Sequence, residues 1–157
     1  MVEKIKKMID AGQYFTINRA RQYGKTTTLR ALAKYLIQDY VVVSLDFQLM
    51  SHKDFAEEGA FVKAFSEAVL RKVSGEDAMP AEIRRELQKL IGDSQEAALS
   101  RLFEILSTWC RISKKPIVLI IDEVDSASNN QVFLDFLSQL RGYYIDRDVT
   151  PAFQSVI

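Results

Sequence analysis

The sequence predicts an α/β fold built on a parallel β-sheet. Two apolar, strand-like segments, residues 41–47 and 117–121, are flanked by segments whose apolar residues recur at helical spacing. Strands that alternate with helices pair in parallel through crossover connections. The segment IVLII at residues 117–121 is wholly apolar, as expected for a strand covered on both faces.

The first third of the chain predicts helix, strand, loop, helix and strand in that order. Residues 3–11 carry Ile5, Met8 and Ile9 at helical spacing, and Gly12 is suited to ending this helix. Residues 14–18 alternate and are β-prone, which predicts a short first strand. We expect a loop over residues 19–24, a helix over residues 25–39 and the second strand over residues 41–47.

The segment between the second and third strands is predicted to be helical. Ser51 with Asp54 is a capping-box pattern, which predicts a helix with an apolar face of Phe55, Val62, Phe65 and Val69. A second helix is expected over residues 80–92, where a proline suits the first position and a glycine the end. Asp93 with Glu96 predicts a third helix, which carries Leu99, Leu102, Leu106 and Trp109. Three helices are more than one crossover needs.

The last part of the chain predicts one more helix and the beginning of a strand. Asn129 or Asn130 is placed to cap a helix that contains Phe133, Phe136, Leu137 and Leu140. The final residues, FQSVI, are typical of a strand. Trp109 and the Phe133/Phe136 pair are predicted core residues.

Composition excludes several classes of protein. The 157 residues suffice for one domain, and 21 basic residues balance 21 acidic ones, so no general positive field favours nucleic acid or an anionic membrane. One cysteine and one histidine provide neither an internal disulfide nor a zinc site. The N-terminus lacks the apolar region of a signal peptide, and no run is long enough to span a bilayer. These features predict a cytoplasmic protein.

The stretch YFTINRARQYGKTTTL has the order of a strand, a phosphate-binding loop and a helix N-terminus. Backbone N–H groups and the helix dipole favour an anion at this point, and Gly24 lets a phosphate approach the backbone. Lys25 is placed to reach the outer phosphates, and the Thr26 hydroxyl to bind Mg²⁺. Arg19 stands where the usual motif has glycine, so a chance Gly-Lys-Thr is the alternative. The predicted phosphate site comprises Arg21, Gln22, Tyr23, Gly24, Lys25, Thr26 and Thr27.

The stretch IVLIIDEVD places two carboxylates at the end of a buried strand. Ligands of open parallel sheets bind at the carboxyl edge. Asp122 is predicted to hold Mg²⁺ through water, and Glu123 to activate the water that attacks the γ-phosphate. The alternative is a strand end that simply turns polar at the surface.

Together these two stretches resemble P-loop ATPases of the AAA+ and signal-transduction ATPase type, with Walker A and Walker B motifs. More narrowly, they are similar to AAA-like domain ATPases of bacteria and archaea, whose loop reads Arg-Pro-Arg-x-x-Gly-Lys-Thr. That group also has arginine at the position of Arg19. At the next position it has proline, where this sequence has Ala20. The resemblance covers most of the chain, but only these two motifs are specific.

The resemblance implies a three-layer α/β/α P-loop fold with strand order 5-1-4-3-2, and ATP with Mg²⁺ as ligands. By position, Lys25 binds phosphate, Thr26 and Asp122 serve Mg²⁺, and Glu123 is catalytic together with Lys25. FQSVI becomes the fourth strand, and the sensor residue, fifth strand and arginine finger would lie beyond the chain. We therefore expect residues 1–157 to be one incomplete P-loop domain of a longer protein, whose site an oligomer or another protein completes.

Several interpretations stay open at this stage. The main one is Mg²⁺-dependent ATP hydrolysis, and the alternative is a nucleotide-controlled switch or interaction module with little turnover. A GTPase is less favoured because no Asn-Lys-x-Asp motif occurs, and a small-molecule kinase fits Asp-Glu less well. Asp46 is either a polar strand end or a group that holds the catalytic glutamate. The basic run RISKK at residues 111–115 is either a solvated flank or a nucleic-acid contact.

Overall fold

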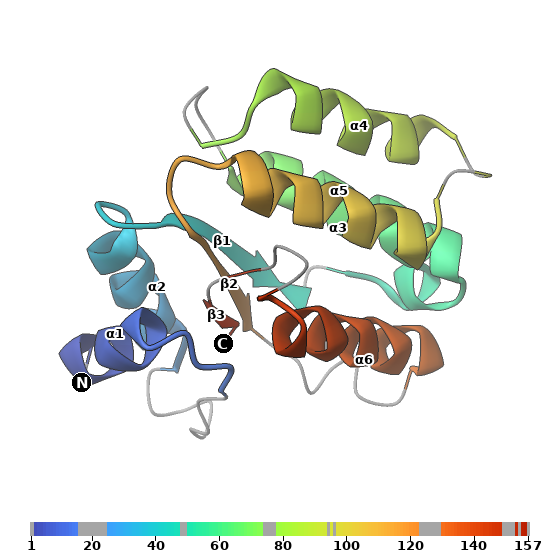
Figure 1. Cartoon of the computed structure of the whole chain (residues 1–157). Coiled ribbons are helices and arrows are strands. Elements are labelled where there is room, and N and C mark those ends of the chain that lie inside the picture. The colour runs from blue at the N-terminus through green and yellow to red at the C-terminus, as the bar shows by residue number, and fades with distance from the viewer. Residues whose placement is uncertain are drawn as a thin grey trace.

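The computed structural model describes residues 2–15, 25–47, 50–73, 78–93, 95, 97–122, 130–148, 153 and 155–156. These residues form helices around a parallel sheet (Figure 1). The strands are β1 (Val41–Asp46), β2 (Ile117–Asp122) and β3 (Ser155–Val156). The helices are α1 (Val2–Asp10), α2 (Lys25–Leu36), α3 (Glu58–Lys72), α4 (Ala81–Gly92), α5 (Leu99–Ile112) and α6 (Gln131–Ile145), with a short 3-10 helix η3 (His52–Phe55).

Strand β2 is the middle strand of the described sheet. It pairs in parallel with β1 on one side and with β3 on the other. The prediction of a parallel α/β fold is thus confirmed, and the expected second and fourth strands are the observed neighbours of the third. Of the expected first strand, residues 14–18, only 14 and 15 are described, and Tyr14 forms an isolated bridge. The places of the first and fifth strands stay predictions.

Helices cover both faces of this sheet (Figure 1). Val43, Leu45 and Leu119 belong to the larger core cluster, which includes side chains from α3, α4, α5 and α6. Val118 and Ile120 point to the other face and pack with α1 and α2. Because each face of β2 meets its own helices, all six of its residues are buried. The apolar run at residues 117–121 therefore marks a doubly covered strand, as predicted.

Helix α1 is joined to the start of β1 by a small polar cluster. The Tyr40 hydroxyl donates a hydrogen bond to Asp10, and Lys6 lies 2.9 Å from the Asp10 carboxylate and 3.5 Å from that of Asp39. Burial and the bond to Asp10 raise the pKa of Tyr40 to about 12. This cluster fixes the end of α1 beside the point where α2 leads into the sheet.

Aromatic side chains dominate the larger core. The ring of Phe47 lies 5.4 Å from that of Phe133, edge to face, and Phe61 lies 5.1 Å from Phe136. Such pairs add about 0.5–1.5 kcal/mol each beyond the area they bury. Trp109 is fully buried, and its indole N–H donates to the Ala78 carbonyl at 3.3 Å. The prediction that Trp109, Phe133 and Phe136 are core residues is confirmed.

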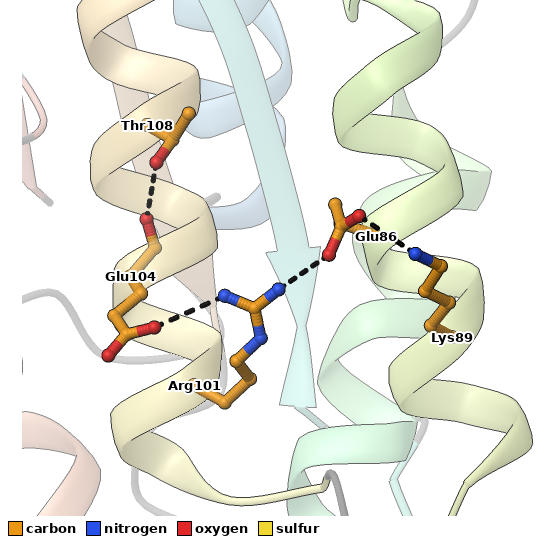
Figure 2. A network of polar contacts seen from close by, with 5 residues as sticks. All are labelled: Glu86, Lys89, Arg101, Glu104 and Thr108. Carbon is orange, nitrogen blue, oxygen red and sulfur yellow. Dashed lines mark hydrogen bonds and ion pairs between the residues drawn. The ribbon is translucent and has the colours of Figure 1, made fainter.

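Helix α4 packs on α3 and α5 on the side away from the sheet (Figure 1). A polar network joins it to α5 (Figure 2). Arg101 of α5 lies 2.5 Å from Glu86 of α4 and 3.1 Å from Glu104, while Lys89 lies 3.2 Å from Glu86. Thr108 donates to the Glu104 carbonyl at 2.9 Å. Partly exposed ion pairs contribute little, so buried Ile83, Leu87 and Leu90 provide most of the attachment.

The first capping box opens a different element from the one expected. Ser51 and Asp54 form the box, with the Ser51 N–H donating to the Asp54 carboxylate at 2.8 Å. It begins η3, and the backbone is extended again at Glu57 before α3 starts. The prediction of one helix from Ser51 onward was therefore wrong. The same hydrogen bonds satisfy the first N–H groups of a single 3-10 turn and of an α-helix.

The third predicted helix is observed as α5 with Leu99, Leu102, Leu106 and Trp109, but the prediction that Asp93 opens it was wrong, and Glu96 lies outside the described residues. The Asp93 carboxylate accepts a hydrogen bond from the Gln95 N–H at 2.9 Å, which is a turn-forming contact two residues along the chain. Helix α5 begins only at Leu99, with Ala98 at the N-cap position. Aspartate makes both kinds of bond, and the sequence pattern does not tell them apart.

Ser66 of α3 gives a prediction about stability. It is fully buried, and within the described structure its Oγ has no hydrogen-bond partner. Because a buried polar group without a partner is costly, we expect Ser66→Ala to raise the free energy of unfolding by about 1 kcal/mol in urea titrations. Ser100→Ala, at an exposed position of α5, controls for helix propensity. A lower free energy of unfolding for Ser66→Ala would show that its hydroxyl is satisfied.

Candidate functional site

The first turn of α2 contains part of the predicted phosphate site. Helix α2 begins at Lys25, so Lys25, Thr26 and Thr27 occupy its first three positions. The first N–H groups of a helix have no partner within the helix, and they carry the positive end of its dipole. No acidic residue lies in this turn, and Thr27 is exposed. The turn is therefore suited to an anion.

Two carboxylates lie side by side at the carboxyl edge of the sheet. Asp46 ends β1 and Asp122 ends β2, and the two are partners in the register of the strands. Asp122 is only 6% exposed. Both aspartates interact with other groups of the chain. Neighbouring strands are about 4.8 Å apart, so these side chains share one local environment. The edge is thus acidic where β1 and β2 meet.

The packing of α2 relates its first turn to this edge. Residues 37–40 connect its end to β1, so the C-terminus of α2 lies near the amino end of that strand. Leu29, Leu32 and Leu36 pack in one cluster with Val118 and Ile120 of β2. A helix of 12 residues is about 18 Å long, close to the length of a six-residue strand. The first turn of α2 therefore points toward the carboxyl edge, where β2 ends.

The predicted site is described only in part. Lys25, Thr26 and Thr27 stand in α2 and Asp122 in β2, whereas Glu123 lies outside the described residues. The rest of the predicted loop lies outside as well: Arg19, Ala20, Arg21, Gln22, Tyr23 and Gly24. The roles of all these residues stay predictions. Among the described residues, no group of three or more histidine, cysteine, aspartate or glutamate side chains is placed to hold a metal ion.

A hollow beside Asp46 was not predicted from the sequence. It has a volume of about 560 Å³ and is lined by Leu45, Asp46, Met50, Asp54, Ala64, Glu67, Ala68, Arg71 and Lys72. Ala64 and Ala68 lie one helical turn apart on α3, and their small side chains leave room at the end of β1. In the sequence, only the two alanines four positions apart could have indicated this hollow. Alanine is common in helices of every kind, so this pattern does not predict a hollow.

The single cysteine offers no reactive thiol. Cys110 stands in α5 and packs against the larger core cluster. Burial raises the pKa of its thiol to about 12. Since the thiolate is the nucleophile, this side chain is inert at neutral pH.

Comparison with known proteins gave a match to a family model. Within the described residues, no helix is both long and apolar enough to cross a membrane. No curated protein and no solved structure gave a significant match. The family model described as AAA-like domain matches residues 2–156, which is nearly the whole chain. The chain therefore belongs to the AAA-like domain family.

Proposed function

We propose that the chain binds ATP with Mg²⁺ at the carboxyl edge of its sheet and hydrolyses it. Membership of the AAA-like family supports a nucleotide-binding domain. The observation that carries the proposal is that buried Asp122 ends the middle strand, while α2, which begins at Lys25, packs against the same strand. A carboxylate and a helix N-terminus that converge on one sheet edge are what a metal-bound polyphosphate requires.

Each residue has a defined part in this proposal. The backbone of Arg21, Gln22, Tyr23 and Gly24 and the side chain of Lys25 bind the phosphates, with Thr27 as a further donor. Hydroxyl and carboxylate oxygens are the ligands that Mg²⁺ prefers, so Thr26 and Asp122 fit that ion. Bound Mg²⁺ would neutralise phosphate charge, and Glu123 would take a proton from the attacking water.

Calorimetric titration of ATP, ADP, AMP and GTP into the wild-type chain tests this function. With Mg²⁺ present we expect ATP and ADP to bind, and AMP to bind far more weakly because it lacks the outer phosphates. Chelation of Mg²⁺ should weaken ATP binding. Release of phosphate from ATP is then measured on the same sample. No binding of any nucleotide at millimolar concentration would show that the proposal is wrong for this chain.

The same titration separates the proposal from the nucleotide-controlled switch. Binding of ATP without release of phosphate would favour the switch. In that case the assay is repeated over a range of protein concentrations. Turnover that rises more steeply than protein concentration would show that a second copy of the chain completes the site.

A further inference from the structure

The C-terminal turn of α6 contacts the turn that follows α1. The Tyr144 hydroxyl donates a hydrogen bond to the Gly12 carbonyl, across 132 positions of sequence. The Tyr144 ring also lies 5.3 Å from the ring of Tyr14, at an angle of 57°. Figure 1 shows the end of α6 close to the chain that leaves α1. One side chain of α6 thus contacts two residues of the same short segment.

The segment that Tyr144 contacts has a defined backbone. Gly12 has a φ of 71°, which favours glycine, and its N–H donates to the Ile9 carbonyl at 2.8 Å. The Gln13 N–H donates to the Met8 carbonyl at 3.1 Å, so the turn closes the end of α1. Tyr14 packs against the larger core cluster, and its burial raises the pKa of its hydroxyl. The Gly12 carbonyl is therefore presented to α6 in a fixed direction.

Tyr144 is itself held in place by the turn that follows α6 and by the packing of that helix. The Arg147 guanidinium lies 4.1 Å from the centre of the Tyr144 ring, and it donates to the Tyr144 carbonyl at 2.9 Å. The neighbouring Tyr143 stacks on Phe103 of α5 at 5.0 Å, and Leu140 is buried. The end of α6 is thus anchored in the core, and Tyr144 is a fixed contact rather than a mobile surface side chain.

The two joined segments lead to the two halves of the proposed site. From Tyr14 the chain continues to Lys25, at the start of α2. From Asp122 it continues to α6, at whose far end Tyr144 stands. We propose that Tyr144 is a positioning residue for nucleotide binding, which acts through Gly12 and Tyr14. This inference rests on the proposed function, because it concerns the affinity of that same site.

Thermodynamic linkage predicts how the contact between Tyr144 and Gly12 and the binding of nucleotide affect each other. If nucleotide binding depends on the position of residues 12–14, loss of the contact weakens that binding. Bound nucleotide must in turn strengthen the contact by the same factor, because coupling between two sites is reciprocal. A contact that serves the fold alone has neither property.

The test compares two variants that each lose one hydroxyl from adjacent residues. Tyr144→Phe removes the bond to Gly12 and keeps the ring, while Tyr143→Phe keeps the stack on Phe103. We expect Tyr144→Phe to weaken binding of Mg²⁺–ADP about fivefold, the effect of one hydrogen bond. In the wild type, ADP should slow amide hydrogen exchange at residues 12–15. That slowing should be smaller in Tyr144→Phe and unchanged in Tyr143→Phe.

The possible results separate this inference from the proposed function. If the wild type binds ADP and Tyr144→Phe binds it equally well, the inference is overturned and the proposed function stands. If the wild type binds no ADP, the proposed function fails and the inference fails with it. Exchange that rises equally in α3, α5 and residues 12–15 of Tyr144→Phe would also overturn the inference, because the contact would then act on the whole fold.

Discussion

Replacement of Lys25 by alanine is expected to weaken binding of Mg²⁺–ATP about a hundredfold, because charge-assisted hydrogen bonds contribute about 1.5–3 kcal/mol each. Lys25 is the first residue of α2, and no acidic residue of that turn offsets its charge. The backbone N–H groups of the turn remain in the variant, so some affinity for phosphate should survive. Calorimetric titration of ATP into both proteins measures the difference.

Lys34→Ala is the matched control for this experiment. Lys34 is an exposed lysine in the last turn of the same helix, so its loss changes net charge equally. It should leave the affinity for ATP within about twofold, because exposed charges more than about 10 Å apart interact weakly in salt. Equal affinities of the wild type and Lys25→Ala would contradict the phosphate-site assignment. Equal losses in both variants would indicate a general effect of charge.

Strands that are marked by a continuous apolar or β-branched run could be predicted from the sequence. The apolar run at residues 117–121 predicted a strand, and β2 is buried along its length. The β-branched run at residues 41–47 predicted β1 to within one residue. The starts of helices were misjudged where an aspartate side chain accepts a hydrogen bond from a nearby backbone N–H, as at Asp54 and Asp93. Such local bonds form equally well in turns, 3-10 helices and α-helices.

Contacts between distant segments could not be predicted in the same way. The sequence predicted that Asp122 ends a strand at the ligand edge, but not that Asp46 is its partner in register. Register depends on how two segments 76 positions apart pack, from Asp46 to Asp122, and no local pattern encodes it. The bond from Tyr144 to Gly12 and the hollow beside Ala64 and Ala68 depend on packing in the same way.

Glu123→Gln is expected to keep the affinity for ATP and to lower its hydrolysis about 10²–10⁴-fold, the usual contribution of a general base. Glutamine has nearly the shape of glutamate but cannot take a proton from water. Glu123 directly follows Asp122, the buried last residue of β2, and its position at the same sheet edge stays a prediction from the sequence. Titration of ATP and release of phosphate are measured on the same preparation.

Two comparisons decide whether a loss of turnover belongs to Glu123. Glu104→Gln, an exposed change on α5, should leave hydrolysis unchanged, because Glu104 pairs with Arg101 of the same helix and has no part in the proposed site. Asp122→Asn should instead weaken the dependence of binding on Mg²⁺, since Asp122 is the proposed ligand of that ion. Equal hydrolysis by the wild type and Glu123→Gln would remove Glu123 from the mechanism. If Asp122→Asn then lost hydrolysis while its binding of ATP kept the dependence on Mg²⁺ of the wild type, the base would have to be sought at Asp122, which is the partner of Asp46 in the strand register.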